Sequence, residues 1–144
     1  MIAVDSNILI YAHRRDSEWH PQAAACLRSL AENLGAWALL WPCLYEFTAI
    51  VTHPRIYAPP SMLQEAIEQI EAWLTSPSCM LLAETTDHWP TLRRVLSMSR
   101  VVGPRVHDAR IAALCIGHGV RELWSADRDF SAFADITVSN PLLR

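Results

Sequence analysis

Short apolar runs alternate with longer segments of helical periodicity along this chain. The apolar runs predict five buried strands, at residues 1–5, 36–41, 79–82, 122–125 and 136–138. The periodic segments predict six helices, at residues 7–14, 21–34, 44–52, 61–73, 87–99 and 107–116. Continuous apolar strands that alternate with helices are typical of a mostly parallel sheet covered on both faces. We therefore expect an α/β fold.

Several predicted boundaries rest on residues with well-understood local preferences. Pro21 favours the first turn of a helix, and Gly35 favours the end of one. Pro42 is expected to end the second strand, and Ser61 is expected to cap a helix that has Glu65 in its first turn. Residues 55–60 and 101–105 are expected to be loops, and residues 131–133 a turn.

Length and hydropathy limit the class of protein. A chain of 144 residues suits a single domain over residues 1–144. No apolar run approaches the roughly 18 residues of a membrane helix, so no membrane association is expected. The N-terminal segment carries an acid where a signal peptide would carry bases, which makes the cytoplasm the expected location.

The cysteines point to reduced thiols rather than to disulfides. None of the four forms a CxxC pair, and each has apolar neighbours. Cys115 and His118 have the spacing of half a zinc site, but no second pair completes it.

Charge neither favours nor excludes a nucleic-acid substrate. The net charge is −3, all 12 basic residues are arginines, and a catalytic lysine is therefore excluded. A nucleic-acid enzyme usually presents a basic face. Bound divalent cations would offset several of the acids, which weakens that objection.

Four acids fall where an open α/β sheet places its functional site. Asp5 closes the first predicted strand, and Asp127 follows the fourth. Glu46 lies early in the helix after the second strand, and Asp108 begins the helix before the fourth. Ligands of such sheets bind beyond the carboxyl ends of the strands. These four residues are therefore our candidate catalytic and metal-binding set.

The residue types indicate chemistry based on hard divalent cations. Clustered carboxylates repel one another unless cations balance them. Magnesium and manganese prefer oxygen ligands and lower the pKa of bound water, as phosphodiester hydrolysis requires. Four acids without convergent histidine or cysteine favour this reaction over zinc-dependent proteolysis.

Each acid also has a structural interpretation. Asp5 and Asp108 could cap helices, and Asp127 could belong to a turn. Glu46 is expected to be buried, because its neighbours are apolar, and an ion pair with an arginine is the structural alternative. Chance placement of all four at one site is much less probable than of any one.

Other polar residues have weaker support. Ser6, Asn7 and Ser125 could orient the carboxylates or their waters, although helix capping explains them equally well. Asp129 could join Asp127, but a solvated turn acid is the simpler interpretation. Arg110 could contact phosphate or balance charge, although a surface arginine is the commoner case.

Four motifs together resemble the PIN domain family. The N-terminal MIAVDSNILIYA is similar to the family's opening, with an acid after the first strand. LYEF carries the family's helix glutamate, HDARIAAL resembles its third acidic motif, and WSADRDF resembles its T-x-D-x-D-F segment. The ordered set spans nearly the whole chain. Its length, without added domains, resembles VapC-type toxins of VapBC toxin–antitoxin systems.

The resemblance implies a three-layer α/β/α sandwich around a short, mostly parallel sheet, and a metal-dependent endoribonuclease. It implies that Asp5 and Asp108 are the main ligands of Mg²⁺ or Mn²⁺, that Asp127 completes the site, and that Glu46 binds metal or its water. The chain departs from the pattern at Ser125, where threonine is usual, but serine keeps the hydroxyl.

The resemblance also implies partners. These are an RNA substrate (tRNA, rRNA or mRNA) and a VapB-type antitoxin whose C-terminal segment blocks the acids. Homodimers, and heterotetramers or larger assemblies with antitoxin, are implied as well. Two readings within the family stay open: a catalytically silent PIN-fold binding module, and an RNA-processing nuclease without an antitoxin.

Two other classes share parts of the pattern but lack required residues. A phospho-receiver domain needs a lysine near its last strand, and this chain has none. A haloacid-dehalogenase-like phosphatase needs Asp-x-Asp after the first strand, where this chain has Asp5-Ser6-Asn7.

Overall fold

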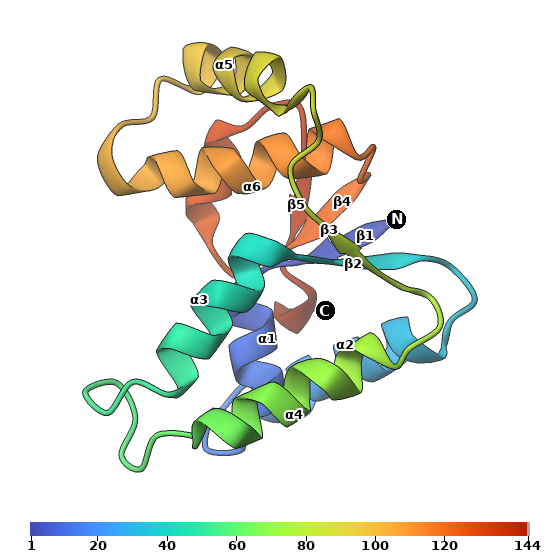
Figure 1. The fold of residues 1–144 in the computed structure, drawn as a ribbon, viewed down its shortest axis with the longest axis vertical. Coiled ribbons are helices and arrows are strands. Elements are labelled where there is room, and N and C mark those ends of the chain that lie inside the picture. The colour runs from blue at the N-terminus through green and yellow to red at the C-terminus, as the bar shows by residue number, and fades with distance from the viewer. Residues whose placement is uncertain (144) are drawn as a thin grey trace.

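A five-stranded parallel sheet forms the centre of the molecule, in a computed structural model that describes residues 1–143 (Figure 1). The strands are β1 (Ile2–Val4), β2 (Trp37–Leu40), β3 (Cys79–Leu82), β4 (Glu122–Trp124) and β5 (Thr137–Ser139). They lie in the order β3-β2-β1-β4-β5, and all four pairings are parallel. The predicted α/β class with a parallel sheet is confirmed.

Helices cover both faces of this sheet. They are α1 (Ser6–His13), α2 (His20–Glu32), α3 (Trp41–Val51), α4 (Leu63–Leu74), α5 (His88–Ser99) and α6 (Val106–Gly117). Figure 1 shows α5 and α6 on one side of the sheet and α1 to α4 on the other. The expected three-layer α/β/α arrangement is therefore present.

The strand order creates a switch point between β1 and β4. From β1 the chain adds β2 and then β3 on one side, and it returns to add β4 and β5 on the other. The connections after β1 and β4 therefore diverge at their carboxyl ends, which is where open parallel sheets bind ligands. Asp5 follows β1 directly, and Ser125 follows β4 directly.

The central strands hold this edge rigidly because they are buried on both faces. Ala3, Val4, Leu39 and Leu123 have no exposed surface, and the continuous apolar runs of the sequence anticipated this. Trp37 is also fully buried, and its indole nitrogen donates a hydrogen bond to Ser76 Oγ at 3.1 Å.

The predicted boundaries around Pro42 are wrong by one to three residues. The second strand ends at Leu40, one residue before the prediction, because Trp41 and Pro42 already form the first turn of α3. Pro42 therefore begins a helix as well as ending a strand, as its fixed φ allows.

Ser61 does not cap α4, contrary to expectation. The cap position is Met62, whose backbone N–H donates to Glu65 Oε1 at 2.8 Å. The Ser61 hydroxyl is buried and lies 3.0 Å from His13 Nε2. A tertiary contact has thus replaced the local one.

Residues 1–143 also contain three short 3₁₀ helices, namely Gly103–Arg105, Arg128–Ala132 and Pro141–Leu143. The first lies within the predicted loop at 101–105, and the second contains most of the predicted turn at 131–133. All four cysteines are free thiols. Within residues 1–143, no helix combines the length and the apolar character needed to cross a membrane.

Candidate active site

An open cleft of about 410 Å³ lies at the carboxyl edge of the sheet, and all four predicted acids line it. Asp5 comes from the end of β1, Glu46 from α3, Asp108 from the first turn of α6, and Asp127 from the segment after β4. Four distant parts of the sequence thus bring carboxylates to one cavity, as the positions of these acids relative to the strands predicted.

Asp5 is the most firmly held of these acids. Its side chain is buried, with 7% of the residue exposed, at the N-cap of α1. The Oδ1 atom accepts a hydrogen bond from the Ser6 backbone N–H at 2.8 Å and one from the Cys43 thiol at 3.6 Å. The Oδ2 atom accepts from the Ser125 hydroxyl at 2.7 Å and from Asn7 Nδ2 at 3.3 Å. Asp5 is thus a helix cap and a cleft acid at once.

Burial raises the pKa of Asp5, and the negative charge of Glu46 raises it further. The hydrogen bonds from Ser125 and Ser6 act in the opposite direction and stabilise the carboxylate. Donors from the fold therefore offset part of the cost of placing this charge away from water.

Ser125 and Asn7 join the ends of β1 and β4. Asn7 Nδ2 donates to Ser125 Oγ at 3.1 Å, and Asn7 Oδ1 accepts from the Ala126 backbone N–H at 3.1 Å. The Ser125 oxygen also accepts from the Asp127 backbone N–H at 3.0 Å. The Ser125 hydroxyl therefore links two of the candidate acids, Asp5 and Asp127, which supports the orienting role suggested for it.

Glu46 lies in the cleft, but not in the environment expected for it. Its side chain is exposed rather than buried, because it lies on the face of α3 that opens to the cleft. No arginine pairs with it among residues 1–143. Instead, Glu46 Oε1 accepts a hydrogen bond from the Ser6 hydroxyl at 2.7 Å. The expectation of a buried Glu46 is therefore wrong.

Asp129 approaches the other acids more closely than its interpretation as a solvated turn acid allowed. Asp108, Asp127 and Asp129 each offer a carboxylate oxygen, and these three oxygens lie within 4.8 Å of one another. Asp127 caps the following 3₁₀ helix and accepts from the Asp129 backbone N–H at 2.8 Å. Asp129 is exposed, while Asp108 and Asp127 are half-buried. Asp5 and Glu46 line the cleft outside this trio.

Asp108 has the clearest electrostatic strain. Burial raises its pKa to about 6, and the charges of Asp127 and Asp5 contribute in the same direction. Arg105 partly counteracts them. The Asp108 carboxylate accepts no hydrogen bond from residues 1–143, so it has nearby like charges and little local compensation. It lies in the first turn of α6 but does not occupy the cap position, which belongs to Arg105.

Arg110 lines the cleft but is already paired. Its guanidinium contacts Glu84 Oε1 at 2.5 Å through both Nε and Nη2. Its charge is therefore mainly balanced by Glu84, which is one of the two roles considered for it. His107 also lines the cleft and is exposed.

The sequence interpretation missed the parts played by Cys43 and Arg105. Cys43 lies on the buried face of α3, and its thiol reaches Asp5 from within the core. Arg105 donates to the Asp129 carbonyl oxygen at 2.7 Å, and no local pattern predicts that contact.

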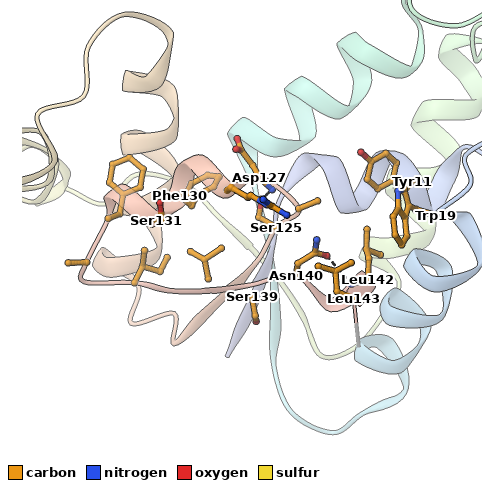
Figure 2. Close-up of a pocket in the computed structure, with 16 residues that line it drawn as sticks. Tyr11, Trp19, Ser125, Asp127, Phe130, Ser131, Ser139, Asn140, Leu142 and Leu143 are labelled. Carbon is orange, nitrogen blue, oxygen red and sulfur yellow. Dashed lines mark hydrogen bonds between the residues drawn. The ribbon is translucent and has the colours of Figure 1, made fainter.

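A second, larger groove of about 910 Å³ adjoins the cleft, and Asp127 and Ser125 lie at its border (Figure 2). Tyr11 and Trp19 lie at one end of this groove, and Phe130 and Ser131 lie at the other. Asn140 also lines it, with Oδ1 accepting from the Leu142 backbone N–H at 3.0 Å. Because Asp127 belongs to both cavities, they form a continuous surface.

The donor set of the cleft suits a hard divalent cation. The trio offers only carboxylate oxygens, and its like charges raise the pKa of Asp108. A cation among them would reverse the repulsion and favour the ionised form. Oxygen-only sites with waters available are typical of Mg²⁺ and Mn²⁺ rather than of zinc.

Comparisons with known proteins agree with this geometry. The PIN domain family profile matches residues 2–136. Ribonuclease VapC48 of Mycobacterium tuberculosis is 33% identical over 137 residues, which cover 95% of this chain and 94% of the relative. Ribonuclease VapC43 of the same species is 32% identical over 142 residues, covering 99% and 96% of the two chains.

Solved structures show the same fold at lower identity. VapBC2 from Rickettsia felis, solved bound to a promoter DNA fragment, has a TM-score of 0.70 at 16% identity and covers 97% of this chain and 98% of its own. VapC20 of Mycobacterium tuberculosis, a sarcin-ricin loop cleaving toxin, has a TM-score of 0.68 at 17% identity, covering 94% and 98%. The matching profile and the full-length relatives show that the chain belongs to the PIN domain family, among the ribonucleases of the VapC type.

Proposed function

We propose that this protein is a metal-dependent endoribonuclease, built as one PIN domain over residues 1–144, and the toxin of a toxin–antitoxin pair. The observation that carries the proposal is the meeting of Asp5, Glu46, Asp108 and Asp127 in one open cleft. Full-length relatives named as VapC ribonucleases support the reaction class.

Asp108, Asp127 and Asp129 are proposed metal ligands because their carboxylate oxygens lie within 4.8 Å of one another, with Asp129 on the exposed side. Asp5 contributes its buried negative charge, held in position by Ser125 and Ser6. Glu46 accepts from the Ser6 hydroxyl and faces the cleft, where it is placed to orient a water or a metal-bound ligand.

A bound Mg²⁺ or Mn²⁺ would lower the pKa of water and offset the charge that develops on the phosphate. The chain's own residues would position the scissile phosphate and accept the proton of the attacking water. Burial and like charge raise the pKa of Asp108 to about 6 without a cation, and a bound cation would lower that pKa and keep Asp108 ionised as a ligand.

The partners are proposals drawn from the relatives. Solved neighbours include VapBC2 of Rickettsia felis and FitAB, both determined on DNA fragments. We accordingly propose a VapB-type antitoxin that covers the cleft, a homodimer, and a heterotetramer or larger assembly with antitoxin. An enzyme that acts on tRNA, rRNA or mRNA works where those RNAs lie, so we place it in the cytoplasm.

A catalytically silent binding module, and an RNA-processing nuclease without an antitoxin, are the alternatives. The full-length relatives named as ribonucleases speak against the first, as does the meeting of all four acids in one cleft. The RNA-processing nuclease differs from the toxin only in lacking an antitoxin. Copurification of a small DNA-binding protein would therefore favour the toxin.

The test is cleavage of total cellular RNA by the purified protein in magnesium, manganese or chelator, beside Asp5→Asn. We expect metal-dependent cutting that falls by at least about 100-fold in the variant, because the cluster loses a charged ligand. Circular dichroism should show the same fold for both proteins. Equal cutting by the two proteins, at matched purity, would remove the assignment of the site.

A further inference from the structure

Two aromatic side chains lie exposed at the α3 wall of the acidic cleft. Tyr45 lines the cleft itself, directly before Glu46, and 65% of it is exposed. Trp41 lies one turn earlier on α3 with 39% exposed. The two ring centroids are 5.9 Å apart, and the ring planes are inclined by 31°. The tyrosine ring is thus supported from one side by the indole.

The fold does not need these rings. Helix α3 packs on the core through its other face, where Cys43, Leu44 and Phe47 are almost completely buried. The buried tryptophan of this region is Trp37, four residues before Trp41. Tyr45 therefore presents an apolar face to water where a ligand of the cleft would cover it, and Trp41 lies beside that ring.

A nucleobase is the ligand whose shape and chemistry match a supported aromatic ring beside a phosphate-cleaving site. Unstacked bases of single-stranded RNA commonly stack on aromatic side chains, and every base has a face suited to this contact. A base inside a duplex is already stacked on both faces, so it reaches a side-chain ring only after leaving the helix.

The groove on the other side of the acids also leaves room for an RNA strand. Beyond Asp127 the cleft continues into the groove of Figure 2, where Tyr11, Trp19 and Asn140 line a cavity of about 910 Å³. A strand whose phosphate lies against the carboxylates would therefore have open surface on which to enter and leave.

We propose that Tyr45, supported by Trp41, stacks on an unpaired base of the RNA beside the scissile phosphate. The inference rests on the proposed nuclease function and assigns a base-binding residue to this cleft. Tyr45 is a substrate-binding residue in this account and takes no part in metal binding.

The test compares Tyr45→Ala with two matched variants, Tyr45→Phe and Tyr45→Leu. Phenylalanine keeps the ring, and leucine keeps apolar bulk without an aromatic face. We expect kcat/KM on an unpaired oligonucleotide to fall on the order of ten-fold or more in Tyr45→Ala and Tyr45→Leu. Tyr45→Phe should stay within about two-fold of the unsubstituted protein, and all three should keep its melting temperature because the side chain is exposed.

Removing the base should have the same effect as removing the ring. A series of oligonucleotides carries a single abasic nucleotide, placed in turn at each position around the mapped cut. We expect the unsubstituted protein to cleave one of these as poorly as Tyr45→Ala cleaves the intact RNA. Tyr45→Ala should cleave that abasic substrate almost as well as it cleaves the intact RNA, because the two changes remove the same contact. Independent losses that simply add would overturn the inference.

Binding of a fluorescently labelled unpaired RNA, measured without cleavage in chelator, separates this inference from the proposed function. Weaker binding by Tyr45→Ala and Tyr45→Leu than by Tyr45→Phe supports stacking, whether or not the protein cuts. Metal-dependent cutting with unchanged Tyr45→Ala binding and kinetics overturns stacking and leaves the nuclease intact. A change in oligomeric state by sedimentation in Tyr45→Ala, with unchanged RNA binding, also overturns it and identifies the rings as an interface between copies.

Discussion

The two sides of the acidic cleft are constructed by different means. On the β1 side, the buried Asp5 carboxylate accepts hydrogen bonds from a backbone N–H, a hydroxyl, an amide and a thiol. On the α6 side, the Asp108 carboxylate accepts no hydrogen bond from residues 1–143 and lies near the carboxylates of Asp127 and Asp129. Hydrogen bonds from the fold orient Asp5, whereas the negative charges of neighbouring acids repel Asp108.

This difference indicates a division of labour. Pre-oriented ligands lose little freedom when a cation binds, while repelling ligands gain the most electrostatic energy from it. Asp5 would thus define where the cation lies, and the Asp108 trio would make binding favourable. The experiments below alter one side while leaving the other unchanged.

The largest effect is expected from Ser125, which organises the β1 side. Ser125→Ala removes the donor to Asp5 Oδ2 and the acceptor for the Asp127 backbone N–H. Loss of such a supporting contact typically costs 10–100-fold in metal affinity or activity, and we expect roughly that loss in the metal dependence of RNA cleavage. Ser125→Thr keeps the hydroxyl and is the matched control. Similar activity in both variants would mean that Asp5 needs no such support.

A smaller effect is expected at Glu46, which belongs neither to the hydrogen-bonded network around Asp5 nor to the Asp108 trio. Its carboxylate is exposed and has one partner, the Ser6 hydroxyl. Glu46→Gln keeps an oxygen to accept that bond but loses the charge. We expect cleavage to fall by about ten-fold at saturating magnesium. Ser6→Ala, which keeps the charge and loses the bond, should cost less. The reverse order would show that orientation matters more than charge.

The smallest effect concerns the α6 side without metal. Folding raises the pKa of Asp108 to about 6, above the ordinary value of 3.8, so the folded protein binds that proton more tightly than the unfolded chain does. This contribution to stability is complete below the lower value and is lost as pH rises through about 6. In chelator at pH 7, Asp108→Asn should therefore raise the melting temperature by roughly 1–3 °C.

The same variant supplies its own control. The melting temperature of Asp108→Asn in chelator should depend less on pH between 4 and 7 than that of the unsubstituted protein. Excess Mn²⁺ should abolish the difference in melting temperature, because the cation stabilises the unsubstituted protein more than the variant. A lower melting temperature for the variant in chelator would contradict the view that Asp108 is electrostatically strained.

The sequence predicted the features that follow from position along the chain. Asp5 and Asp127 follow buried strands, and parallel strands bring their carboxyl ends together, so their meeting was predictable. The strand order, which creates the switch point between β1 and β4, agreed with the expected family fold.

The features that escaped prediction depend on tertiary contacts. Apolar neighbours made Glu46 appear buried, but α3 turns that side chain to the open cleft. Ser61 lost its predicted capping role to a contact with His13. The approach of Asp129 to Asp108 depends on the fold of the 3₁₀ helix after Asp127, which no local pattern fixed.

The most direct test of the central claim is a calorimetric titration with Mn²⁺ of the unsubstituted protein, Asp108→Asn and Asp87→Asn. Asp87 is an exposed aspartate at the start of α5, so its variant makes the same change of charge outside the cleft. The account predicts saturable binding that Asp87→Asn retains and that Asp108→Asn weakens by at least about ten-fold. Equal affinity in all three proteins would contradict the claim that the acidic cleft binds the metal.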